Sequence, residues 1–144
     1  MAVVAGCVDG YRLAYPAARI TFVRPDGNIF VDGAPDLIAQ MLDKLVANAV
    51  QFATGGEVTV MLQRLGDHVR LAVGNDGPLL PEGHSGRLFE SMVSVRAGGD
   101  TGEPHLGLGL YIVRLIAEFH GGTVRADNRS DASGVVVTVS LPVA

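Results

Sequence analysis

The feature that most constrains the fold of this chain is a pattern of one helix and two strands that occurs twice. Residues 36–53 and residues 107–120 carry apolar side chains at helical spacing. Each segment ends at a glycine pair, which favours the end of a helix. The β-rich segments that follow are residues 57–64, 68–75, 123–127 and 135–141. A doubly wound parallel sheet would need a helix between every two strands, so the pattern predicts an α/β (α+β) two-layer sandwich with a mixed, mostly antiparallel sheet.

The N-terminal part of the sequence predicts a short helix and a hairpin. Residues 3–14 favour a helix that Gly10 breaks and Pro16 ends. Residues 19–24 alternate in a β-rich pattern, and residues 29–31 return after a turn that contains proline, aspartate and glycine. Two strands around such a turn predict a hairpin before the first long helix.

Composition narrows the class of protein. The chain has 144 residues, of which 48% are hydrophobic, so we expect one domain with its own core over residues 1–144. A formal net charge of −4 argues against nucleic-acid binding. Cys7 is the only cysteine, which excludes an intramolecular disulfide and fits a reducing compartment. No apolar stretch approaches the roughly 20 residues that span a bilayer, so we expect no direct membrane insertion.

Asn48 is a polar residue inside the first long helical segment. Lys44 and Gln51 lie one turn to either side of it, so the three residues share one face of a helix. Asparagine is a poor residue for the middle of a helix. It is either an ordinary surface residue or an amide oxygen offered to a hard cation such as Mg²⁺, which takes few protein ligands.

Two glycine-containing motifs are further candidates for a binding site. Asn75, Asp76 and Gly77 end a predicted strand, either as a common turn or as a place where Asn75 reads an adenine edge and Gly77 lets the backbone pass close to the ring. Gly107 and Gly109 open the second long helix. They are either packing spacers or residues that let backbone N–H groups approach a phosphate at the helix N-terminus.

These motifs occur in one order along the chain. An Asn-bearing helix precedes a strand that ends in Asn-Asp-Gly, a Phe-Glu segment at residues 88–92, a glycine-rich segment at residues 97–104 and a Gly-Leu-Gly-Leu run. Over nearly its whole length the chain therefore resembles the catalytic, ATP-binding domain of two-component sensor histidine kinases. That domain belongs to the GHKL superfamily, with gyrase, heat-shock chaperones and mismatch-repair ATPases. The resemblance implies a Bergerat-type fold that binds ATP and Mg²⁺ between its helices.

The resemblance also implies roles for residues at matching positions. Asn48 matches the asparagine that coordinates Mg²⁺, and Asn75 stands where the family usually has the aspartate that binds the adenine amino group. Gly77 and Leu80 match positions that line the adenine pocket, and Phe89 matches a phenylalanine of a short motif. The residues that match the phosphate side of the site are Gly107, Leu108, Gly109 and Leu110.

The chain departs from the family pattern at several positions. His105 replaces the first glycine of the phosphate motif, and Leu106 replaces its common serine or threonine. Gln51 stands where a lysine or arginine is frequent, and Lys44 replaces a second asparagine. These substitutions put the list of phosphate ligands in doubt. The cations that either compensate or are ordinary surface residues are Lys44, Arg96 and His105.

The resemblance implies a histidine kinase activity that this chain cannot complete alone. ATP-hydrolysing branches have a glutamate at the position of Lys44, so we expect little hydrolysis. The domain would present the γ-phosphate of Mg-ATP to a histidine on a separate dimerisation domain, and would serve a response regulator indirectly. None of the four histidines suits the acceptor role. A stand-alone serine kinase of the anti-sigma type and a non-catalytic nucleotide-binding or protein-interaction module remain alternatives.

Three further expectations concern the context of the domain. Residues 96–103 are rich in glycine and are predicted to form a lid that orders on Mg-ATP. The domain is expected to be a monomer, because in this family dimerisation belongs to the helical domain that this sequence lacks. We expect it in the cytoplasm, either free or as the cytoplasmic part of a membrane-bound sensor kinase.

Overall fold

The computed structural model describes residues 2–25, 27, 29, 31, 33–77, 104–129 and 133–143, with the backbone alone at residues 2, 3, 5 and 104–109. The helices of the described residues are α1 (Ala2–Ala14), α2 (Pro35–Phe52) and α3 (Pro104–Phe119). The strands are β1 (Arg19–Val23), β2 (Glu57–Leu65), β3 (His68–Asp76), β4 (Thr123–Asn128) and β5 (Gly134–Pro142). None of these helices is long and apolar enough to cross a bilayer.

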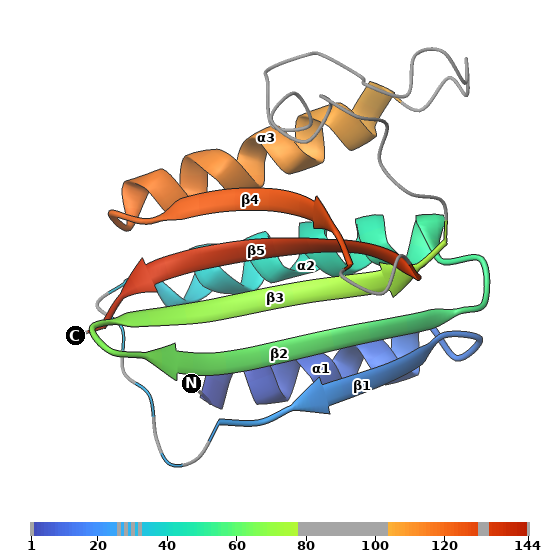
Figure 1. The fold of residues 1–144 in the computed structure, drawn as a ribbon, viewed down its shortest axis with the longest axis horizontal. Helices are drawn as coiled ribbons and strands as arrows, with labels where there is room; N and C mark the ends of the chain where they lie inside the picture. The colour runs from blue at the N-terminus through green and yellow to red at the C-terminus, as the bar shows by residue number, and fades with distance from the viewer. Residues whose placement is uncertain are drawn as a thin grey trace.

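The strands form one sheet in the order β1-β2-β3-β5-β4 (Figure 1). β1 and β2 are parallel, whereas the β2–β3, β3–β5 and β4–β5 pairs are antiparallel. Because β3 and β4 both run antiparallel to β5, they run parallel to each other. α2 therefore connects the parallel strands β1 and β2, and α3 connects the parallel strands β3 and β4. The repeated pattern in the sequence corresponds to these two helical crossovers.

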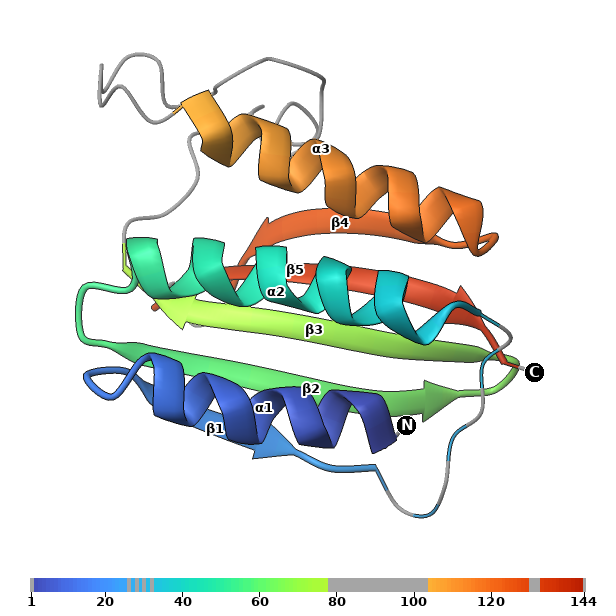
Figure 2. The ribbon, with the colours of Figure 1, turned by 180° about the vertical axis from the view of Figure 1, so that it is seen from behind.

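The helices of the described residues lie together on one side of the sheet, with α2 between α1 and α3 (Figure 2). We call the covered side of the sheet the helix face and the opposite side the open face. Alternation along β5 separates the two faces, because Val137 and Val139 are buried while Val136 and Thr138 are only half-buried. The predicted two-layer α/β sandwich with a mostly antiparallel sheet is confirmed.

The predicted N-terminal hairpin is wrong. β1 pairs in parallel with β2, in a register that joins Arg19 to Glu57 and Val23 to Met61. Ile29 and Val31, which are the described residues of the predicted return strand, lie outside any strand. Ile29 is only 3% exposed and joins the hydrophobic core. Burial of this side chain thus replaces the local strand pairing that its sequence pattern predicted.

The N-terminal helix differs from its prediction at Gly10, because α1 continues through that residue to Ala14. Val4 and Val8 lie on the buried side of α1 and are at most 1% exposed. Packing of this apolar stripe outweighs the cost of one glycine in a helix, which is about 1 kcal/mol. The Tyr11 hydroxyl also donates a hydrogen bond to the Asp43 carboxylate on α2. Burial is the larger cause of a raised pKa of the Tyr11 hydroxyl, and the hydrogen bond to Asp43 raises this pKa further.

Candidate nucleotide site

The polar stripe of α2 runs from the core to the surface. Lys44 is half-buried, Asn48 is 8% exposed and Gln51 is exposed. The side-chain oxygen Oδ1 of Asn48 is buried and has no hydrogen-bond partner among the described residues. A buried polar atom without a partner costs about 1–3 kcal/mol. Asn48 Oδ1 and Arg114 Nε are the buried side-chain atoms of the described residues that have no hydrogen-bond partner, and Asn48 Oδ1 is the acceptor of the two, which suits a cation.

Asn75 supplies a second buried amide on the same side of the sheet. It is 5% exposed and lies on β3, which packs against α2. Its amide nitrogen Nδ2 donates a hydrogen bond of 2.8 Å to the backbone carbonyl of Asp76. Asn48 and Asn75 are the buried polar residues of the described chain. The sequence motifs identified both of them as candidate site residues.

The start of α2 is held by His120, a residue that sequence reasoning did not select for the site. Its Nδ1 bonds to the Ile116 carbonyl at 2.8 Å, and its Nε2 accepts the Ala34 backbone N–H at 3.2 Å. Ala34 is the residue just before α2 and makes no side-chain cap there. A Cβ on Gly33 would lie 2.6 Å from the His120 ring. The ring thus joins the end of α3 to the N-terminus of α2 and fixes the helix that carries Asn48.

The other end of α2 is joined to the end of β3. The Asp76 carboxylate accepts the backbone N–H groups of Gly55 at 2.9 Å and Glu57 at 3.3 Å. Gly77 has a φ of +132°, and a Cβ there would lie 2.5 Å from the Phe52 carbonyl oxygen. The structure thus places Gly77 against the last turn of α2, and its predicted close approach to adenine stays a prediction. The role of Asp76 was not predicted, because its partners are backbone N–H groups.

The glycines of the predicted phosphate motif lie inside α3. The helix begins at Pro104, three residues before the predicted start, and proline is favoured at the first position of a helix. Only the first four N–H positions of a helix lack an intrahelical partner. Gly109 lies beyond them, so its N–H belongs to the regular helix, whereas Gly107 lies in the first turn. The predicted approach of both glycines to a phosphate stays a prediction, for which Gly107 is the better placed of the two.

Several predicted site residues lie outside what the structure describes. Leu80, Phe89, Arg96 and the predicted lid at residues 96–103 fall in the undescribed part of the chain. The side chains of the residues from His105 to Gly109, which include Leu106 and Leu108, are also not described. Leu110 is described, is 2% exposed and belongs to the hydrophobic core. The described geometry of the predicted site is therefore that of its α2 and β3 parts.

Comparison with known proteins identifies the family. Residues 33–144 match the model of the histidine kinase-, DNA gyrase B- and HSP90-like ATPase family. The chain belongs to this family. The sensor protein ChvG of Agrobacterium fabrum is 38% identical over an alignment of 122 residues that covers 80% of this chain and 20% of that protein. The sensor protein KdpD of Escherichia coli is 36% identical over 115 residues, which are 79% of this chain and 12% of that protein.

Solved structures of sensor kinases have the same fold as this ATPase domain. A mycobacterial sensor histidine kinase, MprB, superposes with a TM-score of 0.81 at 23% identity, over 98% of this chain and 92% of that one. The nucleotide-free catalytic domain of the histidine kinase ThkA gives 0.78 at 28% identity, over 97% and 90% of the two chains. A structure of ThkA with the response regulator protein TrrA gives 0.76 at 26% identity, over 97% and 39%. The predicted resemblance to the catalytic domain of sensor histidine kinases is confirmed.

Proposed function

We propose that this domain binds Mg-ATP between α2, α3 and the end of β3, and presents the γ-phosphate to a histidine on a separate helical domain. The observation that carries the proposal is the burial of two amides, Asn48 and Asn75, on the helix face. Family membership supports ATP as the ligand, because the matching family is one of ATPases. The chain spans 20% and 12% of the two sensor proteins described above, so the activity of a whole kinase remains a proposal.

The β3 part of the proposed site would bind adenine through Asn75. Because the Asp76 carbonyl accepts from Nδ2, the side-chain oxygen is the end of the amide that is left to accept a hydrogen bond. An adenine amino group is a matching donor. The amide lacks the charge of the aspartate that is usual in the family, yet it offers the same acceptor without the cost of burying a carboxylate.

The α2 part of the proposed site would hold Mg²⁺ through Asn48. Amide oxygens are ligands that suit Mg²⁺, and the buried Oδ1 of Asn48 has no other partner among the described residues. When bound, Mg²⁺ would neutralise charge on the phosphates. The half-buried Lys44, one turn before Asn48, would add a positive charge on the same stripe. A protonated lysine cannot act as a general base, so Lys44 supports transfer to a partner rather than hydrolysis.

The described histidines support an acceptor that lies outside this chain. Both ring nitrogens of His120 are hydrogen-bonded, to Ala34 and Ile116. His68 begins β3 in the hairpin with β2 and contacts Asp67 at 2.6 Å. We therefore infer a partner domain that brings the phospho-acceptor histidine, and a response regulator that acts after it. We also propose that residues 1–144 form one cytoplasmic domain that is monomeric by itself.

Calorimetric titration of a non-hydrolysable ATP analogue, with and without Mg²⁺, tests this function. The wild-type domain is expected to bind the analogue more tightly with Mg²⁺. Asn48→Ala is expected to lose about tenfold to a hundredfold in affinity, and only in the presence of Mg²⁺, because it removes one bond to a charged group. Gln40→Ala, which replaces an exposed amide on the same helix, is the matched control and should bind normally.

The outcomes of this titration separate the proposed function from its alternatives. Absence of binding to the folded wild-type domain would contradict the kinase function and favour a protein-interaction module. An equal loss with and without Mg²⁺ in Asn48→Ala would assign Asn48 to the fold rather than to the cation. Phosphate transfer to a serine of a partner protein, with none to a histidine, would favour the anti-sigma type of serine kinase.

A further inference from the structure

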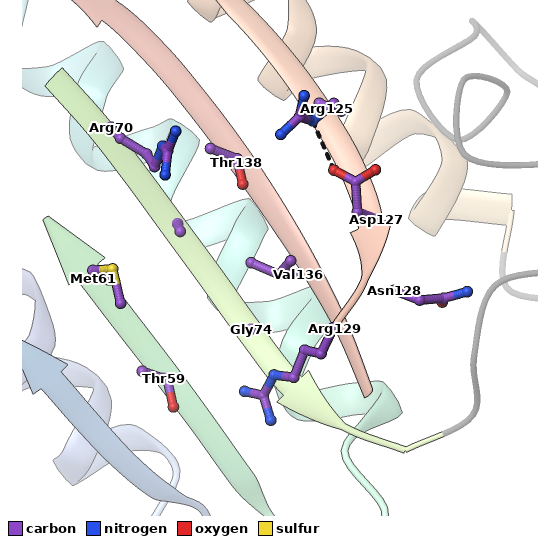
Figure 3. A pocket seen from close by; sticks show the side chains of 11 residues that line it. Thr59, Met61, Arg70, Gly74, Arg125, Asp127, Asn128, Arg129, Val136 and Thr138 are labelled. Atoms are coloured by element: carbon purple, nitrogen blue, oxygen red, sulfur yellow. Dashed lines mark ion pairs between the residues drawn. The ribbon is translucent and has the colours of Figure 1, made fainter. Parts of the chain in front are cut away.

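The open face of the sheet carries a hollow that the proposed function does not use. Its volume is about 730 Å³, and it extends across β2, β3, β5 and the end of β4. Neutral side chains such as Thr59, Met61 and Thr138 form its floor, and Arg70, Arg125 and Arg129 stand around it (Figure 3). We call this hollow the open-face groove. The sheet separates it from Asn48 and Asn75, because Gly74 of the groove alternates with Asn75 along β3.

Small residues in the middle of β3 create the groove. Ala72 and Gly74 leave little side chain above the central strand. The Arg129 side chain extends from the end of β4 across the sheet and covers Gly74, as Figure 3 shows. A Cβ on Gly74 would lie 2.8 Å from Nη2 of Arg129 and 3.2 Å from its Nε. Glycine at position 74 therefore leaves room for the Arg129 guanidinium over the central strand.

The charge of the groove is opposite to that of the chain. Arg125 pairs with Asp127 at 2.7 Å. Arg70 and Arg129 have no ion-pair partner among the described residues, although both line the groove. The groove lining thus contains three arginines and one aspartate, whereas the whole chain has 11 lysines and arginines and 15 acidic residues. Two cations are left to pair with an anionic partner.

We propose that the open-face groove binds an acidic segment of a polypeptide. A guanidinium binds a carboxylate with two parallel hydrogen bonds, which suits aspartate and glutamate side chains. The methionine, valine and threonine side chains between the arginines suit the apolar and neutral residues of such a segment. Nucleic acid would need a larger basic surface than three arginines on a chain of net charge −4.

The test uses a fluorescein-labelled peptide with repeats of Glu-Ala-Asp-Leu, and its counterpart with Gln and Asn in place of Glu and Asp. Binding is followed by fluorescence anisotropy in the presence of a saturating Mg-ATP analogue, which keeps the peptide out of the nucleotide site. The acidic peptide should bind and the neutral peptide should not. Arg70→Glu with Arg129→Glu should weaken binding by about tenfold or more. The milder Arg70→Gln with Arg129→Gln pair should weaken it in the same direction.

The matched control is Arg24→Glu with Arg64→Glu, which changes the net charge equally at exposed arginines outside the groove. This control should bind the acidic peptide like the wild type, and every variant should bind the ATP analogue unchanged. Amide NMR signals of Gly74 and Thr138 should shift on peptide addition, and those of Asn48 should not. Absence of peptide binding, or equal loss in the control, would overturn the proposal. Tighter binding of a DNA duplex or of phosphatidylserine vesicles at the same arginines would also overturn it.

Discussion

The two faces of the sheet differ in burial and in charge, although they are built from the same strands. On the helix face most of the alternate strand residues are packed into the core, and Asn48 and Asn75 are buried there as well. On the open face the small residues Ala72 and Gly74 are buried, but most of the other alternate residues are half-buried or exposed, and they include Arg70 and Arg125. Residues on the helix face must satisfy both the core and the proposed nucleotide site. Residues on the open face have no core to fill, so their charges are available for a partner.

Neighbouring valines on β5 test this contrast with one chemical change. Val137→Ala on the helix face should lower the free energy of unfolding by about 2 kcal/mol, because it removes buried methyl groups and leaves a cavity. Val136→Ala on the open face should lower it by less than about 0.5 kcal/mol, as is usual for positions near the surface. Chemical denaturation of both variants measures the difference. Equal losses would mean that the open face is covered in solution.

The contact between His120 and the start of α2 gives the second largest expected effect. His120→Ala removes an acceptor for the Ala34 N–H and should cost about 1–1.5 kcal/mol of stability. Gly33→Ala should also destabilise the wild type, because the new Cβ would lie 2.6 Å from the His120 ring. The stability loss caused by Gly33→Ala should be smaller when His120→Ala is already present. A double-mutant cycle of thermal unfolding measures this difference. Additive costs would show that the ring and Gly33 do not interact.

The sequence predicted the elements of this fold better than their partners. Apolar periodicity and the glycine pairs indicated α2, α3 and the strands β2 to β5 close to their bounds. The same local patterns failed at residues 29–31 and at Gly10, where burial of Ile29, Val4 and Val8 decides the structure. A β-rich segment indicates a strand but does not identify its neighbour. β1 pairs with β2, which follows only after the whole of α2.

The candidate site was predictable where a polar residue stands among apolar residues in the sequence. Asn48 interrupts the apolar face of a helix, and Asn75 lies one residue before the end of a largely buried strand, so both are unexpected in sequence. The roles of His120 and Arg129 were not predictable. His120 meets Ala34 across 86 positions of the chain, and Arg129 meets Gly74 only because β5 brings the two ends of the strands together. Contacts of this kind depend on the fold and leave no local pattern.

Asn75 allows a test of the helix face that separates binding from stability. Asn75→Leu keeps a similar shape but removes the acceptor, and should lower the affinity for the ATP analogue by about tenfold, which corresponds to about 1.4 kcal/mol. Asn75→Asp keeps an acceptor and should change the affinity by less than about threefold. Calorimetric titration of both variants, with Gln40→Ala as the control, measures these effects. Normal affinity of Asn75→Leu for the ATP analogue would show that Asn75 does not bind adenine.

Gly74 gives the smallest expected effect and tests the open face alone. Gly74→Ala should displace the Arg129 guanidinium, because a Cβ would lie 2.8 Å from Nη2. The side chain of Arg129 is flexible, so the stability should change by less than about 0.5 kcal/mol, as for most surface changes. Affinity for the acidic peptide should nevertheless fall by about twofold to threefold, and it should not fall further when Arg129→Ala is added. Since position 74 faces away from Asn75, the ATP analogue should bind normally. A loss of nucleotide affinity in Gly74→Ala would show that the two faces are coupled through the central strand β3. The proposed nucleotide site and the open-face groove would then not be independent of each other.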